Sequence, residues 1–165
     1  MGISMRLYLA PDSDLRAFTG APKTLQKWLR QRRSLKDMWL QEHWRDIDAI
    51  LAADPSASSN YSPLTPRGAD FVYPTVADHG AHGLTSTSTE QLLQSLAQVT
   101  TPRVEAYVRL RSMIHSSEPG SAPLPTTEQL AAETQALLTH LACLEEACML
   151  AVSKRYGLVM ALWNL

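Results

Sequence analysis

The sequence predicts an α+β fold: a single, mostly helical domain over residues 1–165, with a small sheet that includes strands from both chain ends. Residues 3–9 alternate apolar and polar side chains, which is typical of a strand with one buried face. Residues 158–163 form an apolar run of strand length, as expected for a strand buried on both faces. Because the second run stands at the end of the sequence, we expect it to pair with the first strand and to close the domain.

Three helices are expected in the first half of the chain. Pro11 breaks the first strand, and Gly20 stands where glycine commonly follows a helix. Ser34 can cap the third helix, whose apolar residues mostly keep helical spacing. The three expected helices span residues 12–18, 23–33 and 34–52.

Two capping boxes predict helix starts in the second half, at 87–90 and at 126–129. Pro102 opens another helix between them, and Gly157 is expected to end the last one. These helices are expected over residues 87–99, 102–115 and 127–155.

The region between the two sets of helices is predicted to hold loops and short strands. Its Pro, Ser and Asn content predicts a long surface loop over 54–68. Short strands are expected at 71–73 and 84–85, and a tight, glycine-flanked turn at 79–83.

Composition limits the partners and the compartment. The net charge of −1 gives no overall field to attract nucleic acid or an anionic membrane, and no apolar run has the length of a membrane span. Cys143 and Cys148 diverge on one predicted helix, so they are expected not to pair. Unpaired thiols and the lack of a secretory signal favour the cytoplasm.

No catalytic residue and no cofactor is predicted. The sequence has no Gly-x-Ser-x-Gly motif, no activated-cysteine context and no glycine-rich phosphate loop. One metal candidate stays open, the Asp78-His79-x-x-His82 turn, where two imidazoles and a carboxylate can converge. A second open candidate is the set of His43 and nearby carboxylates on one helix, which has the residue types for acid–base chemistry.

Recognition residues are more evident than catalytic ones. Six basic residues between Lys23 and Lys36 surround Trp28, and an acidic protein, a nucleic acid or solvent could face them. Trp39 and Trp44 cannot share one helical face, so one of them is expected to be exposed as an interface anchor. The predicted partner contacts are Trp39, Glu42, Arg45 and Asp46.

Three stretches occur along the chain in an order that resembles a known family. A strand opens with Met-Gly, a helix is centred on a tryptophan, and a capped helix precedes a long helix and an apolar terminal strand. These stretches are residues 1–9, Ser34-Leu35 with 43–51, and the chain from Leu84-Thr85 to the terminal strand. Together they resemble the YfbM-like family, domain of unknown function 1877, over nearly the whole chain.

The resemblance implies a bacterial cytosolic α+β domain without an established enzyme activity, and it assigns no catalytic residues. The sequence departs from the family at Ala52-Ala53, where a Thr-Gly stop is usual, and at Asp48, where a histidine is frequent. By analogy at the level of fold, some small domains of this kind serve as immunity proteins that neutralise a cognate toxin.

The function expected is therefore that of a bacterial cytosolic protein-binding domain, an immunity protein that occludes the active site of a toxin effector. The alternative is a small metal-dependent hydrolase or ligand-binding enzyme that uses the Asp78-His79-x-x-His82 turn. A third hypothesis is a subunit that forms a homodimer through exposed apolar surface. Neither nucleic acid nor membrane is an expected partner.

Overall fold

The computed structural model describes residues 3–39, 43–52, 68–73, 80–117, 120 and 123–164. Within them, strands and helices build an α+β fold, which confirms the predicted class. The strands are β1 (Ile3–Ala10), β2 (Lys36–Trp39), β3 (Phe71–Tyr73), β4 (Ala81–Leu84) and β5 (Gly157–Asn164). The helices are α1 (Asp12–Thr19), α2 (Pro22–Gln31), α3 (His43–Ala52), α4 (Ser86–Ala97), α5 (Thr101–Ser116) and α6 (Thr127–Lys154).

The sheet has the strand order β2-β1-β5-β4-β3, and every neighbouring pair is antiparallel. The expected pairing of the two chain ends is confirmed, because β5 pairs with β1 from Ile3↔Asn164 to Ala10↔Gly157. β5 is the central strand, and Leu158 to Ala161 are fully buried. The last strand of the chain therefore joins the two halves of the sheet.

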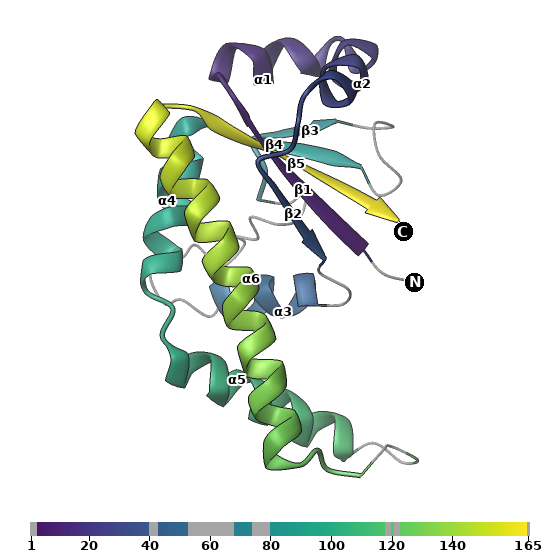
Figure 1. Ribbon diagram of the computed structural model, residues 1–165, viewed down its shortest axis with the longest axis vertical. Helices are drawn as coiled ribbons and strands as arrows, with labels where there is room; N and C mark the ends of the chain where they lie inside the picture. Colours follow the sequence, from purple (N-terminus) through teal and green to yellow (C-terminus); the bar gives the residue numbers. More distant parts are fainter. Residues whose placement is uncertain are drawn as a thin grey trace.

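Each face of the sheet carries its own core. Alternate β5 residues contribute Leu158 and Met160 to one core, with α3, α4, α5 and α6, and Val159 and Ala161 to the other, with α1 and α2. Figure 1 shows α1 and α2 at one end of the long axis and α5 at the other, where α5 and the first half of α6 extend beyond the sheet. The two ends of the molecule thus expose different helices.

α6 is long and apolar enough to cross a membrane by length and composition alone. It also supplies buried residues from Thr134 to Ala151, and a core helix meets the same criterion. Its N-terminus confirms the predicted capping box, since the Thr126 and Gln129 side chains each accept a hydrogen bond from the other's backbone N–H.

Two predicted helix boundaries are wrong by a few residues. Thr85, and not Thr87, caps α4, because the Thr85 hydroxyl accepts the Ser88 N–H and its carbonyl accepts the buried Thr89 hydroxyl. α6 ends at Lys154 with Arg155 in the left-handed region, so Gly157 begins β5 instead of ending the helix.

The predicted helix over 34–52 is wrong in its first part, which forms strand β2. Leu35 N–H donates to the Leu7 carbonyl at 2.7 Å, and Met38 pairs with Met5 and is buried in the core. The backbone groups at the edge of β1 find partners only if this segment is extended, and this pairing overrides the local helical spacing.

The predicted turn at 79–83 is also wrong where the structure describes it. Ala81, His82 and Gly83 lie in β4, between β3 and β5, and are buried. Gly83 leaves room for the Tyr73 hydroxyl, which would lie 2.7 Å from a Cβ at this position and donates to the Leu15 carbonyl. The glycine thus permits a close contact across the sheet, a role that glycine has in strands as well as in turns.

Candidate interaction surfaces

The four predicted contact residues do not form one described surface. Trp39 ends β2, where its backbone pairs with Ser4, and Glu42 lies outside the described residues. Arg45 is exposed on the first turn of α3, with its guanidinium carbon 5.1 Å from the centroid of the half-buried Trp44 ring. Asp46, the next residue, points inward and is only 5% exposed.

Asp46 joins three helices through a polar network. The Tyr107 hydroxyl of α5 donates to the Asp46 carboxylate at 2.7 Å, and the Arg111 guanidinium bonds both Asp46 and Glu133 of α6. Burial and the neighbouring carboxylate raise the pKa of Tyr107 to about 12. Asp46, which was predicted as a partner contact, is thus buried in a contact between helices, and Asp48 of the same helix is buried as well.

His43, the proposed acid–base group, lies against a second histidine. Its ring centroid is 5.4 Å from that of His140 on α6, and its Nδ1 is buried without a hydrogen-bond partner among the described residues. Burial, and then the neighbouring His43, lower the pKa of His140. The described residues contain no group of three or more His, Cys, Asp or Glu side chains that could hold a metal.

Of the Asp78-His79-x-x-His82 candidate, only His82 lies within the described residues. It is 1% exposed in the interior strand β4, opposite Met160 of β5. Cys143 and Cys148 are both free, as predicted, and burial raises the pKa of the Cys148 thiol to about 12, which keeps it protonated.

The clearest exposed apolar surface lies on α5 and was not predicted from the sequence. Leu110, Met113 and Ile114 are 59%, 64% and 55% exposed, and we call these three residues the α5 outer face. Val104 and Val108 are buried on the opposite side of the helix. The signal was present in the sequence, because residues at i, i+3 and i+4 lie on the same side of a helix.

The predicted basic cluster is divided by the fold. Lys36 lies in β2 and pairs with Glu146 of α6 at 2.6 Å. The remaining members are exposed on α2 and in the two residues that follow it. We call these five residues, Lys23, Lys27, Arg30, Arg32 and Arg33, the α2 basic patch.

No family model matches this sequence, and no curated protein matches it. Among solved structures, the chain is similar to the crystal structure of a protein of unknown function, YfbM from Escherichia coli. The TM-score is 0.62 at 11% sequence identity, over 97% of this chain and 98% of that chain. The chain therefore has a YfbM-like fold, which confirms the resemblance at the level of fold.

Proposed function

We propose that this chain is a protein-binding domain that holds its partner through the α5 outer face. The observation that carries the proposal is the exposure of Leu110, Met113 and Ile114 on a helix whose opposite side is already buried. A helix that is apolar on two sides normally has both sides covered. Among the described residues, α5 is covered on the side that faces α3 and α6.

The spacing of the α5 outer face fits an amphipathic helix of the partner. Side chains at i, i+3 and i+4 form the ridges between which another helix packs. Arg109 is exposed one helical turn before Met113, so an acidic residue at the edge of the partner helix would find an opposite charge. The proposed occupant is thus an apolar helix with an acidic margin.

In its specific form, the proposal is that the partner is a toxin effector and that binding occludes the toxin's active site. α5 and the first half of α6 extend away from the sheet, as Figure 1 shows, and such a projection has the shape needed to enter a cleft. Arg45, exposed on the first turn of α3, supplies a second polar contact for this mode of binding.

Two matched methionine variants test the surface. Met113→Glu places a charge on the α5 outer face, whereas Met149→Glu does the same on α6, where Met149 is 57% exposed and near the end of its helix. Each chain is co-expressed and co-purified with the products of the neighbouring genes, and the affinity for any recovered protein is measured by calorimetry. Since a buried methionine contributes about 1.5–3 kcal/mol, Met113→Glu should weaken the complex at least about tenfold.

The control separates a surface effect from a folding effect, because Met149→Glu should bind like the parent chain. Equal weakening by both variants, or recovery of no partner, contradicts binding through α5. A parent chain that is dimeric by light scattering, with a monomeric Met113→Glu variant, would mean that a second copy covers this face. The immunity form is tested by growth: co-expression must protect cells from the partner, and Met113→Glu must lose that protection.

A further inference from the structure

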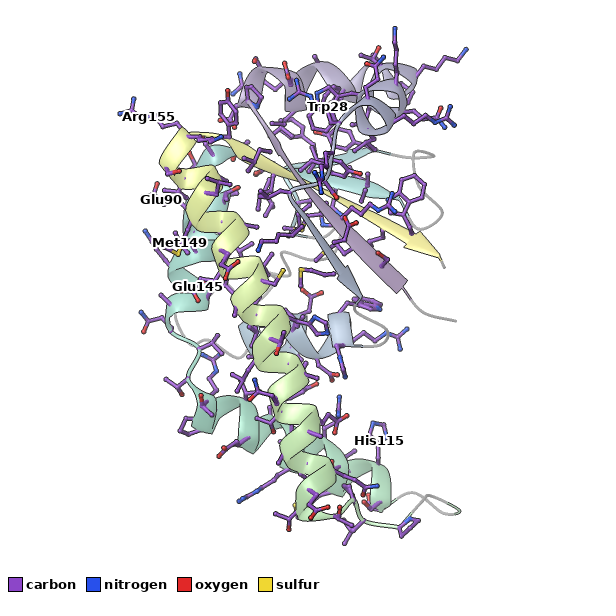
Figure 2. All side chains as sticks on the ribbon, in the orientation of Figure 1. Trp28, Glu90, His115, Glu145, Met149 and Arg155 are labelled. Carbon is purple, nitrogen blue, oxygen red and sulfur yellow. The ribbon has the colours of Figure 1, made fainter. Side chains whose placement is uncertain are left out.

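The α2 basic patch gathers five basic residues on a chain whose net charge is −1. No Asp or Glu occurs between Leu15 and Lys36. Within the described part of the chain, none of the five patch side chains forms an ion pair, whereas Arg6, Lys36 and Arg111 each do. Figure 2 shows long nitrogen-tipped side chains standing out from this end of the molecule, near the labelled Trp28.

The spacing of the patch is unfavourable for the isolated helix. Lys23 and Lys27 are four residues apart, and Lys27 and Arg30 are three apart, so like charges are neighbours on one side of α2. The other side of α2 buries Leu25 and Leu29 in the core. Packing of the buried side therefore keeps these like charges close together, and a negative charge placed along the patch would reduce their repulsion.

One member of the patch is already oriented. The Arg32 guanidinium carbon lies 4.9 Å from the centroid of the Trp28 ring, and that ring packs against Tyr8 and Phe18 at centroid distances of 5.7 and 5.2 Å. A guanidinium held over a fixed ring loses less conformational freedom on binding, and its planar donors match a carboxylate. Arg32 is thus oriented to bind a carboxylate through bidentate hydrogen bonds.

We propose that the α2 basic patch docks an acidic, carboxylate-rich segment of a protein partner. This surface is separate from the α5 outer face, since α2 and α5 lie at opposite ends of the long axis in Figure 1. α2 is about 15 Å long, so about five extended residues of the partner cover it. Alternate carboxylates on such a segment lie on one side and face the patch.

Two features disfavour other anionic partners. A membrane-surface helix inserts its apolar side into lipid, but the apolar side of α2 is buried in the core through Leu25 and Leu29. Single-stranded nucleic acid needs open aromatic rings on which bases stack, but Trp28 packs against Tyr8 and Phe18 and lies beneath Arg32. Carboxylates need neither insertion nor stacking.

The test uses the full chain and a fluorescent synthetic peptide of alternating Glu and Ala, about eight residues long, so that it spans α2. Binding is followed by fluorescence anisotropy at ionic strengths of about 0.05 and 0.15 M, where the screening length changes markedly. Lys27→Glu reverses one patch charge, and Lys154→Glu reverses an exposed lysine in the last turn of α6 as the matched control. Arg32→Lys keeps the charge and removes the planar donors.

Lys27→Glu should weaken peptide binding about fivefold, and Lys154→Glu by less than about twofold, because exposed charge pairs act over short range. Arg32→Lys should weaken binding about twofold or more, since the lysine keeps the charge but cannot form the bidentate hydrogen bonds of a guanidinium. Higher salt should weaken all complexes. Circular dichroism of each variant should match the parent, because the altered side chains are exposed.

Four results would overturn the proposal. The peptide does not bind at the lower ionic strength, or both lysine reversals weaken it equally. A single-stranded oligonucleotide of equal charge displaces the peptide and binds more tightly, which would assign the patch to nucleic acid. In co-sedimentation, the chain has a higher affinity for vesicles containing phosphatidylserine than for the peptide, which would assign the patch to lipid.

Discussion

At the scale of single residues, Gly157 marks the point where the polypeptide leaves the helical layer and enters the sheet. A Cβ built on it would overlap the carbonyl oxygen of Leu84 and press on the side chain of Leu15. Gly20, by contrast, has open space around its Cα and a φ of −93°, which any residue adopts. An added side chain would therefore overlap its neighbours at Gly157 but not at Gly20.

Gly157→Ala should destabilise the fold by about 2 kcal/mol or more, because backbone atoms of the central strands must move apart to relieve the overlap. Gly20→Ala should be neutral or stabilising by up to about 1 kcal/mol, through a smaller entropy loss on folding. Urea denaturation followed by circular dichroism measures both changes. Equal effects of the two substitutions would show that the close approach of Leu84 and Leu15 to Gly157 does not limit the stability of the fold.

At the scale of elements, α3 is held to α5 and α6 by polar contacts in addition to its apolar side. Asp46 accepts hydrogen bonds from Tyr107 and Arg111, and the Arg103 guanidinium donates to the Ile50 carbonyl near the C-terminus of α3. A cation at this end of a helix satisfies carbonyl groups that lack partners within the helix. The position of α3 thus depends on side chains from α5.

Asp46→Ala should cost about 3 kcal/mol in the free energy of unfolding, because it leaves Arg111 and Tyr107 partly buried with fewer partners. Asp37→Ala is the comparison. Among the described residues, Asp37 forms an exposed ion pair with Arg6 at 3.7 Å and accepts a hydrogen bond from the Ser34 hydroxyl, so its loss should cost less than about 1 kcal/mol. Chemical denaturation measures both. If Asp46→Ala cost no more than Asp37→Ala, the network would not hold α3 in place.

At the scale of the whole molecule, the contact between His43 and His140 links stability to pH. The pKa of His140 lies below its usual 6.5 in the folded protein, first because of burial and then because of His43. The unfolded chain therefore binds more protons than the folded one as pH falls below about 6.5. Full stability is present above that pH and is lost as pH falls towards the lowered pKa.

His140→Gln should flatten this part of the stability–pH curve, whereas a change at the exposed His115 should leave its slope unaltered. Figure 2 labels His115 at the far end of α5, away from the α3 helix. Urea midpoints measured at several pH values between about 5 and 7.5 give the slope. A slope that persists in His140→Gln would mean that other groups carry the pH dependence.

Local patterns in the sequence determined much of the fold. The alternation at 3–9 and the apolar run at 158–163 located β1 and β5, because burial on one or both faces leaves a pattern within the segment itself. The box from Thr126 to Gln129 located the start of α6, since its hydrogen bonds join residues three apart. Helices α1, α2 and α5 were also predicted close to their observed bounds.

Other features depend on partners that are distant in the sequence and follow from the packed fold. The segment 36–39 is a strand because β1 has an edge to pair with, and Ala81 to Leu84 form an interior strand because β5 lies beside them. Asp46 points inward because Tyr107 and Arg111 offer hydrogen bonds, and Arg111 faces the interior while Leu110 faces solvent. The spacing of apolar residues indicates which side of a segment is buried. Backbone pairing and polar networks join residues dozens of positions apart, so that spacing does not predict them.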